Sequence, residues 1–394
     1  MATAMKSVTP LVREVPHTVS PGLWALAWKR LQSDHVGMVS LAIVAAFILL
    51  MILSGAGLIA KDWNRETGAN YAPPSFIGAD IEGGAPAAPE TQPAAPTPAT
   101  EYKSSVVDPL ADVLAEIRGE KGTATPAGAD EGKTVDPLAD VMADIRAGSA
   151  KDGAKGAEVV EARTATLPFG GDKWGRDVLK KTIKGSETSI FVGLAAAAVA
   201  VFIGTIFGAV AGYYGRWVDD FFNWFYSIFS SIPYLLLILA VAAVLQQKGI
   251  HTIILILGLT GWTGVFRLIR GEYLKHKARE YVQAADAIGA SNARRMFVHI
   301  FPNVSHVVLV QLSILTVGFI KAEVILSFLG FGVPVDVVSW GSMLNEAQNE
   351  LILGKWWQLV AATVAMATLV TAFSLFTDAL RDALDPKLKG RMGA

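Results

Sequence analysis

Lys321 and Glu323 are the only charged residues in an otherwise apolar run from Val304 to Leu329. A charge near the centre of a bilayer costs roughly 2.5–3.5 kcal/mol, so such residues usually face a cavity or a partner. Side chains two residues apart on a helix point in different directions, so no simple ion pair between them is expected. The two residues therefore line a polar pathway or gate, or they mark the membrane surface with Lys321 extended towards water.

The sequence contains no catalytic or metal-binding constellation. Cysteine is absent from its 394 residues, which excludes disulfides and thiolate chemistry. The apolar runs and the loops between them contain no Ser/His/Asp or H-E-x-x-H pattern, and no G-x-x-x-x-G-K-[ST] phosphate loop occurs. We therefore predict no catalytic, cofactor-binding or metal site, which disfavours an enzyme such as a membrane hydrolase. Four histidines lack metal-ligand spacing and are expected to be structural: His251, His276, His299 and His306.

The elements that position the charged pair are expected to be membrane helices. Hydrophobic residues make up 52% of the chain and charged residues 18%, and the net charge of −1 gives no reason to expect nucleic-acid binding. A helix crosses a bilayer with about 20 apolar residues. Buried helices of a soluble core do not explain six such runs. The predicted fold class is thus an all-α integral membrane protein with six transmembrane helices, at Val36–Ala60, Ser186–Gly212, Phe221–Leu245, Ile250–Phe266, Val304–Leu329 and Trp356–Phe376.

Positive charges predict the orientation of these helices in the lipid bilayer, because Lys and Arg concentrate in cytoplasmic loops. The opposite short loops carry Lys248 and Lys355. Both terminal segments, residues 1–35 and 381–394, are therefore predicted to be cytoplasmic. The first span, 36–60, begins late and is too long for a signal peptide, so it should stay as an anchor. The basic residues of the predicted cytoplasmic side are Lys6, Arg13, Lys29, Arg30, Arg216, Arg267, Arg270, Lys275, Lys277, Arg279, Arg294, Arg295, Arg381, Lys387, Lys389 and Arg391.

Glycines recur four residues apart in the second span, at Gly204, Gly208 and Gly212. This spacing stacks small residues on one face of a helix, where another backbone can approach closely. The pattern predicts either a tightly packed helix pair at the core of a transporter or ordinary packing between membrane helices.

A segment of different composition, residues 61–168, follows the first span and is predicted to be extracytoplasmic and largely disordered. Its Tyr71–Thr100 part is rich in Ala, Pro and Gly, which is typical of extended linkers. A motif then occurs twice, as VDPLADVLAEIR at Val107–Arg118 and VDPLADVMADIR at Val135–Arg146. Each copy has an Asp-Pro helix start and one apolar face. The copies are either docking helices for an extracytoplasmic partner or a duplicated piece of tolerated linker, and a scaffold built on them is an alternative function.

The most informative stretch is EYVQAADAIGASNARRMFVHIFPN, Glu280–Asn303, on the predicted cytoplasmic side. Its alanines predict a short helix with a thin surface. Gly289 can take the left-handed conformation that ends a helix, and Ser291 or Asn292 can cap the next one. The stretch is either a low-profile helix that fits a groove of another protein or a solvated basic loop.

This stretch resembles the EAA coupling loop of ABC-importer permeases, in which Glu-Ala-Ala is followed by Gly and, thirteen residues later, by Pro. Gln283 replaces the Glu, while Ala284, Ala285, Gly289 and Pro302 are in register. The repeat-bearing insert is a departure from that family, and no counterpart of it is carried over. Five further motifs resemble permeases of the dipeptide, oligopeptide and nickel importers: FGGDKWGRDVL (Phe169–Leu179), GYYGRWVDD (Gly212–Asp220), AEVILSFLGFG (Ala322–Gly332), SWGSML (Ser339–Leu344) and RDALDPKL (Arg381–Leu388).

The resemblance implies a type I ABC-importer permease fold, with a core at 169–380 and a coupling loop at 271–302. Such a permease of the bacterial inner membrane pairs with a second permease, two ABC ATPase subunits and an extracytoplasmic substrate-binding protein. ATP and Mg²⁺ would be held by the ATPases, so no cofactor is expected in this chain. The coupling residues implied in the 280–302 stretch are Glu280, Gln283, Ala284, Ala285, Gly289 and Pro302.

The resemblance also favours di- and oligopeptides as the substrate, with nickel chelates, opines and peptide antibiotics as alternatives. Glu323 falls on a position of the family pattern AE-x-x-L-S-F-L-G, whereas Lys321 does not. An ion-coupled secondary transporter is the remaining alternative. That class more often shows a buried acidic relay and repeated sets of spans, and the sequence shows neither.

Overall fold

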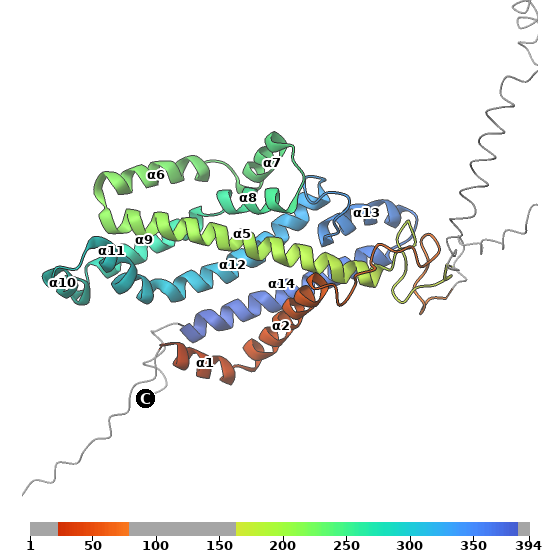
Figure 1. Cartoon of the computed structure of the whole chain (residues 1–394), viewed down its shortest axis with the longest axis horizontal. Helices are drawn as coiled ribbons and strands as arrows, with labels where there is room; N and C mark the ends of the chain where they lie inside the picture. Colours follow the sequence, from red (N-terminus) through yellow and green to blue (C-terminus); the bar gives the residue numbers. More distant parts are fainter. Residues whose placement is uncertain (1–22, 79–162, 385–394) are drawn as a thin grey trace, which may run out of the picture. The chain divides into compact units, whose positions relative to one another are not determined.

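A computed structural model describes residues 23–78 and 163–384, and within these residues the chain forms helices and no β-strand. The predicted all-α fold is therefore confirmed (Figure 1). The helices are α1 (Leu23–Ser33), α2 (His35–Gly55), α5 (Val178–Tyr214), α6 (Arg216–Ser230), α7 (Tyr234–Leu245), α8 (Ile250–Thr260), α9 (Thr263–Lys277), α10 (Glu280–Ala287), α11 (Asn292–Arg294), a π-helical turn (Arg295–Ile300), α12 (Phe301–Phe328), α13 (Trp340–Ile352) and α14 (Trp357–Leu384).

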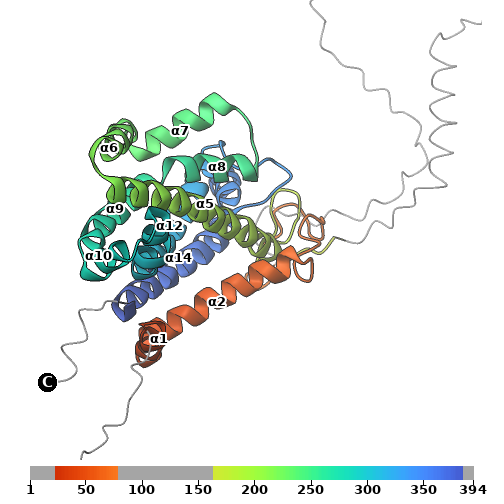
Figure 2. The ribbon, with the colours of Figure 1, turned by 60° about the vertical axis from the view of Figure 1, so that its left-hand side comes forward.

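Helix α5 is the central element of the bundle. It packs against α8, α9 and α12, and its first part also contacts α2. In both views, α6 and α7 lie on one side of α5 and α14 lies on the other (Figures 1 and 2). The short helix α10 lies at one end of the bundle and α13 lies at the other, and we name the two ends after them (Figure 1). Because α5 runs between these ends, it connects them physically.

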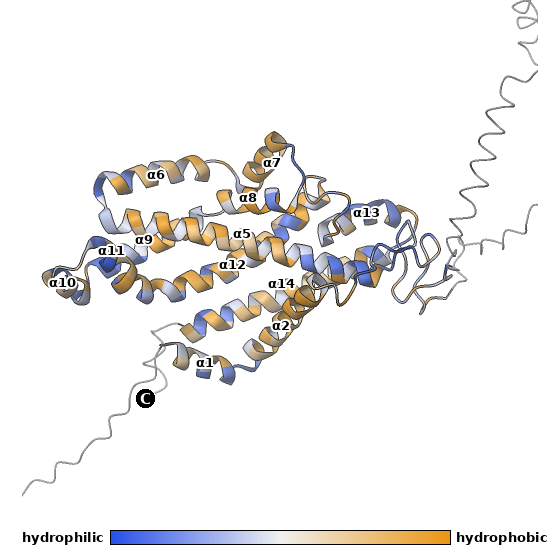
Figure 3. Cartoon of the chain, viewed as in Figure 1, coloured by the Kyte–Doolittle hydropathy of each residue, from blue (hydrophilic) through white to orange (hydrophobic). Residues whose placement is uncertain are grey.

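Four helices are long and apolar enough to cross a membrane: α2, α5, the Asn292–Phe328 run that contains α12, and α14. Two bent pairs, α6 with α7 and α8 with α9, are also long and apolar enough to cross a membrane when each pair is taken as one span. The predicted six spans are obtained if each bent pair counts as one span. Apolar residues cover the middle of the bundle, whereas hydrophilic residues gather around α11 and around the loops at the α13 end (Figure 3).

Two of the predicted spans are not straight helices. The predicted span Phe221–Leu245 is divided into α6 and α7, which lie at 83° to each other. The break falls at Pro233, which lacks a backbone N–H and keeps the preceding residue out of the helical conformation. The predicted span Ile250–Phe266 bends by 42° between α8 and α9, and α9 continues to Lys277. The first residues of the predicted 271–302 loop are therefore helical.

Several helix ends differ from the predicted spans. Helix α2 ends at Gly55 rather than at Ala60, and α5 begins at Val178 rather than at Ser186. The early start of α5 comes from Asp177, whose carboxylate accepts hydrogen bonds from the first backbone N–H groups of the helix. Hydropathy alone misses such a start because the first turns contain lysines. It also misses α13, whose composition is mixed.

The boundaries predicted for the disordered insert were wrong at both ends, because residues 61–78 and 164–168 belong to the folded part. Isolated β-bridges join Gly68 to Thr164 and Pro74 to Leu167. Gly175 requires glycine, since its φ is +78° and a Cβ there would lie 2.0 Å from the carbonyl oxygen of Gly68. The duplicated motifs at 107–118 and 135–146 lie outside the described residues.

Candidate functional site

Helix α10 presents a thin, mostly exposed surface at its end of the bundle. Val282 and Ala285 are buried and attach the helix, whereas Gln283 and Ala284 are exposed. Just after the helix, the Ile288 side chain is 83% exposed. Small side chains and one protruding hydrophobic residue make a surface on which another protein can lie close to the backbone.

The turn after α10 has the geometry that the sequence predicts. Gly289 has a φ of +85°, and its N–H donates to the carbonyl oxygen of Asp286 at 2.9 Å. The next helix is capped by Ser291, whose hydroxyl oxygen accepts from the N–H of Arg294 at 3.3 Å. Nothing lies within 4 Å of a Cβ placed at Gly289, so glycine is needed there for backbone conformation and not for space.

The α10 region is tied to the end of α5 by polar contacts. Arg295 forms an ion pair with Asp286 of α10. The Tyr213 hydroxyl donates to Asn292 Oδ1 at 3.1 Å, and Lys277 Nζ donates to the Tyr213 carbonyl at 2.6 Å. Tyr213 is next to the last residue of α5, so these contacts connect the segment that follows α10 to the central helix.

The remaining residues of the predicted coupling loop have local roles in this chain. Glu280 is exposed in the first turn of α10, where a carboxylate stabilises the helix N-terminus. The Gln283 amide donates to the Ala278 carbonyl at 3.3 Å, so one of its two N–H bonds is used within the loop. Pro302 is the second residue of α12, directly after the π-helical turn, and it supplies no N–H to the helical hydrogen bonds there.

The glycine stripe of α5 packs directly on α9. A Cβ at Gly204 would lie 2.7 Å from the carbonyl oxygen of Trp262, and one at Gly208 would lie 2.8 Å from that of Phe266. At Gly212 the nearest atom would be the Arg270 carbonyl oxygen, at 2.6 Å. The stripe therefore brings two backbones together within the chain, as the sequence predicts for a tightly packed helix pair.

Lys321 and Glu323 point to different surroundings, as their spacing predicts. Lys321 is exposed, whereas Glu323 is completely buried near the α13 end of α12. The Ser327 hydroxyl donates to Glu323 Oε1 at 2.7 Å. In the single chain, Glu323 therefore faces the packed interior, and a role for either residue in a pathway or gate stays a prediction.

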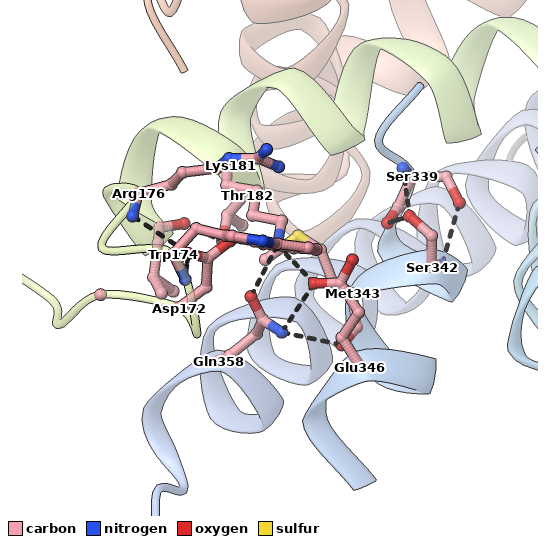
Figure 4. A network of polar contacts seen from close by, with 12 residues as sticks. Asp172, Trp174, Arg176, Lys181, Thr182, Ser339, Ser342, Met343, Glu346 and Gln358 are labelled. Carbon is pink, nitrogen blue, oxygen red and sulfur yellow. Dashed lines mark hydrogen bonds and ion pairs between the residues drawn. The ribbon is translucent and has the colours of Figure 1, made fainter. Parts of the chain in front are cut away.

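A buried polar cluster at the α13 end was not singled out in the sequence. Lys181 Nζ donates to Asp172 Oδ2 at 2.7 Å, to Glu346 Oε2 at 2.5 Å and to Gln358 Oε1 at 3.0 Å (Figure 4). Asp172 also accepts from the backbone N–H groups of Trp174 and Arg176. The three ammonium protons of Lys181 are thus all used, and the cluster joins α5, α13, α14 and the loop before α5.

The sequence carried a partial signal for this cluster. Asp172 belongs to the FGGDKWGRDVL motif, whereas Lys181 follows that motif and Glu346 follows SWGSML. The motifs therefore lie within two residues of Lys181 and Glu346 and include Asp172. The partners are separated by up to 177 positions, so only the tertiary structure shows that they meet around one ammonium group.

Comparison with known proteins agrees with this arrangement. Residues 204–390 match the family described as "binding-protein-dependent transport system inner membrane component", and residues 22–74 match the N-terminal TM domain of oligopeptide transport permease C. The dipeptide transport system permease protein DppC of Bacillus subtilis (strain 168) is 38% identical over 221 residues, which cover 56% of this chain and 69% of that protein. The chain belongs to this permease family. It is a multi-pass inner-membrane protein that acts in a transport complex with other subunits.

Two further relatives support the same assignment. The oligopeptide transport system permease protein OppC of Bacillus subtilis (strain 168) is 38% identical over 221 residues, which cover 56% of this chain and 72% of that protein. OppC of Haemophilus influenzae (strain ATCC 51907 / DSM 11121 / KW20 / Rd) is 37% identical over 219 residues, covering 56% of this chain and 70% of that protein. The resemblance predicted from the sequence is confirmed. The family match of residues 204–390 includes α10, Gly289 and Glu323 of the permease.

A second carboxylate of the permease, Glu350 of α13, is buried beside the cluster. It is 1% exposed, and neither of its oxygens meets the geometry of a hydrogen bond with a described residue. Burial raises the pKa of Glu350 from its ordinary 4.5 to about 7, although the positive charge of Lys181 opposes the rise. Near neutral pH this group is therefore partly protonated.

We expect the stability of the permease to fall as pH rises from about 4.5 to about 7, because of Glu350. Between these pH values Glu350 keeps its proton in the folded chain but releases it in the unfolded chain. Its contribution to stability is therefore complete below about pH 4.5 and is lost as the pH rises through about 7. Thermal unfolding of the detergent-solubilised chain at pH 5 and pH 8 measures the difference. Glu350→Gln should reduce this pH dependence, and the exposed Asp336→Asn should not. An unchanged pH profile in Glu350→Gln would contradict the assignment.

Proposed function

We propose that the chain is the transmembrane permease subunit of an ATP-binding-cassette importer of di- and oligopeptides. It forms the translocation pathway with a second, homologous permease. Two ABC ATPase subunits bind at the α10 end and hold ATP and Mg²⁺, and a substrate-binding protein delivers peptide at the α13 end. The names of the curated relatives, dipeptide and oligopeptide transport permeases, support the peptide substrate.

The orientation proposed from the basic residues fits this arrangement. It places both termini and α10 in the cytoplasm, and α13 on the extracytoplasmic side. The chain itself is non-catalytic in this proposal, since ATP hydrolysis belongs to the partner subunits. Its task is to convert a movement at α10 into a change of the helix bundle.

The observation that carries the proposal is the way α10 is built. The helix exposes Gln283, Ala284 and Ile288 to a partner. The Arg295–Asp286 ion pair joins α10 to the π-helical turn, and Asn292 of α11, just before that turn, accepts from Tyr213 at the end of α5. A force applied to α10 therefore reaches α5 through short, polar contacts. Along α5 the glycine stripe holds α9 so closely that both helices must move together.

Gly289→Pro tests this coupling role. Pro cannot adopt the φ of +85° and lacks the N–H that Gly289 donates to Asp286, so α10 should lose its present orientation. We expect the rate of ATP-driven uptake of a labelled dipeptide by proteoliposomes to fall at least about tenfold. A tenfold fall corresponds to a free-energy difference of about 1.4 kcal/mol. Gly289→Asn is the matched control, because Asn tolerates the left-handed conformation.

The same preparation tests the partner at α10. The sequence has no cysteine, so Ile288→Cys introduces a unique thiol, which should crosslink to an ATPase subunit in the purified complex. Normal uptake by Gly289→Pro, with the chain inserted, would refute the coupling role. Absence of dipeptide uptake by the wild-type complex would refute the peptide substrate.

A further inference from the structure

A cavity of about 210 Å³ lies at the α13 end, between the loop before α5, the α7–α8 loop and the α12–α13 loop. It is smaller than the roughly 300–1,000 Å³ of pockets that enclose a drug-sized ligand, so it suits one end of a longer molecule. Apolar side chains of the α12–α13 loop form one wall: Val333, Pro334, Val335, Val337 and Val338.

The charged groups on the wall of this cavity fall into two kinds. Lys181 and Glu346 line it but are bonded to each other within the buried cluster. Arg176 and Lys248 also line it, and neither has an ion-pair or side-chain hydrogen-bond partner among residues 23–78 and 163–384. Two cations of the cavity are therefore not neutralised by the described part of the chain.

Aromatic rings fix the position of the Arg176 guanidinium group. Its Cζ lies 4.3 Å from the centroid of the Trp174 ring and 5.6 Å from that of Trp63. The Nε atom is buried and has no acceptor. Stacking uses the face of the guanidinium plane and leaves its N–H edge for a ligand, and that edge matches both oxygens of a carboxylate.

We propose that this cavity binds the C-terminal carboxylate of a peptide, with Arg176 and Lys248 as the cations that receive it. The inference rests on the peptide import proposed above and identifies where the chain first holds the substrate. The carboxylate pairs with the edge of the Arg176 guanidinium group and with the ammonium group of Lys248. The side chain of the terminal residue packs on the wall formed by the valines, and the rest of the peptide extends out of the cavity.

The test compares the dipeptide alanyl-valine with its C-terminal amide. The full-length chain is placed in nanodiscs, and binding is titrated by saturation-transfer NMR, which detects weak ligands. We expect the amide to bind at least about tenfold more weakly than the acid, because it leaves the cations unpaired. Arg176→Gln and Lys248→Gln should each weaken binding of the acid by about the same factor. Lys248 is exposed, so its variant keeps the fold.

Lys173→Gln is the matched control. Lys173 also lies over the Trp174 ring, with its Nζ 3.9 Å from the ring centroid, but it does not line the cavity. Its substitution should leave binding of the acid unchanged. Equal binding of acid and amide, or wild-type affinity in both Arg176→Gln and Lys248→Gln, would overturn the inference. Acetate that binds as tightly as the dipeptide would also overturn it and indicate a site for an acidic side chain of a docking protein.

The two proposals fail in different ways. If proteoliposomes import dipeptide but the chain does not distinguish acid from amide, the cavity assignment is wrong and the peptide importer stands. If the chain distinguishes them but the complete complex imports no peptide, the proposed function is wrong, and the carboxylate site in the cavity stands.

Discussion

Lys181→Met is expected to lower the free energy of unfolding by about 3–5 kcal/mol, the usual cost of removing one partner from a buried ion pair. The Lys181 side chain is 2% exposed and Asp172 is completely buried, so solvent hardly screens this ion pair. Asp172 would keep its two backbone N–H partners but lose its cation, and Gln358 would lose the donor that its side-chain oxygen accepts. Thermal unfolding of the detergent-solubilised chain measures the loss.

Lys180→Met is the matched control for this prediction. The neighbouring lysine also forms an ion pair, with Asp62 at 2.6 Å, but the two side chains are 37% and 41% exposed. Exposed pairs contribute about 0–1 kcal/mol, so this variant should unfold almost as the wild type does. A loss of similar size in both variants would show that the burial of the cluster is not what makes Lys181 important.

Gly208→Leu is expected to prevent close packing of α5 on α9. A Cβ alone would lie 2.8 Å from the Phe266 carbonyl oxygen and 3.0 Å from the Arg270 backbone nitrogen, so the two backbones must separate. Overpacking of a tight contact usually lowers the free energy of unfolding by about 1–3 kcal/mol. A whole leucine side chain pressed against a backbone should cost about 3 kcal/mol or more. The yield of monodisperse chain after solubilisation and its thermal midpoint should both fall.

The control lies on the opposing helix. A Cβ at Gly264 of α9 meets nothing within 4 Å in this chain, so Gly264→Leu keeps the contact between α5 and α9. It also replaces glycine by a better helix former, which is worth up to about 1 kcal/mol. If Gly208→Leu purified and unfolded like Gly264→Leu, the glycine stripe would not be the reason why these helices lie so close.

Much of the fold could be predicted because membrane helices depend on local composition. A run such as Val36–Ala60 contains no charged residue, and the surrounding lipid requires its backbone to form helical hydrogen bonds. The turn at Gly289 was predictable for a similar reason, since the preference of glycine for the left-handed conformation at a helix end is local. Hydropathy did not show the breaks at Pro233 and at Gly261, because a broken span has the same composition as a straight one.

The candidate sites divide in the same way. The sequence by itself determined the family, the helical class, the turn at Gly289 and the glycine stripe, because each depends on residue type and short spacing. Only the tertiary structure decided that Lys181 joins Asp172, Glu346 and Gln358, and that the cations of the α13-end cavity differ in their partners. The physical reason is that ion pairing and burial depend on distances between segments far apart in the chain, and no local pattern encodes those distances.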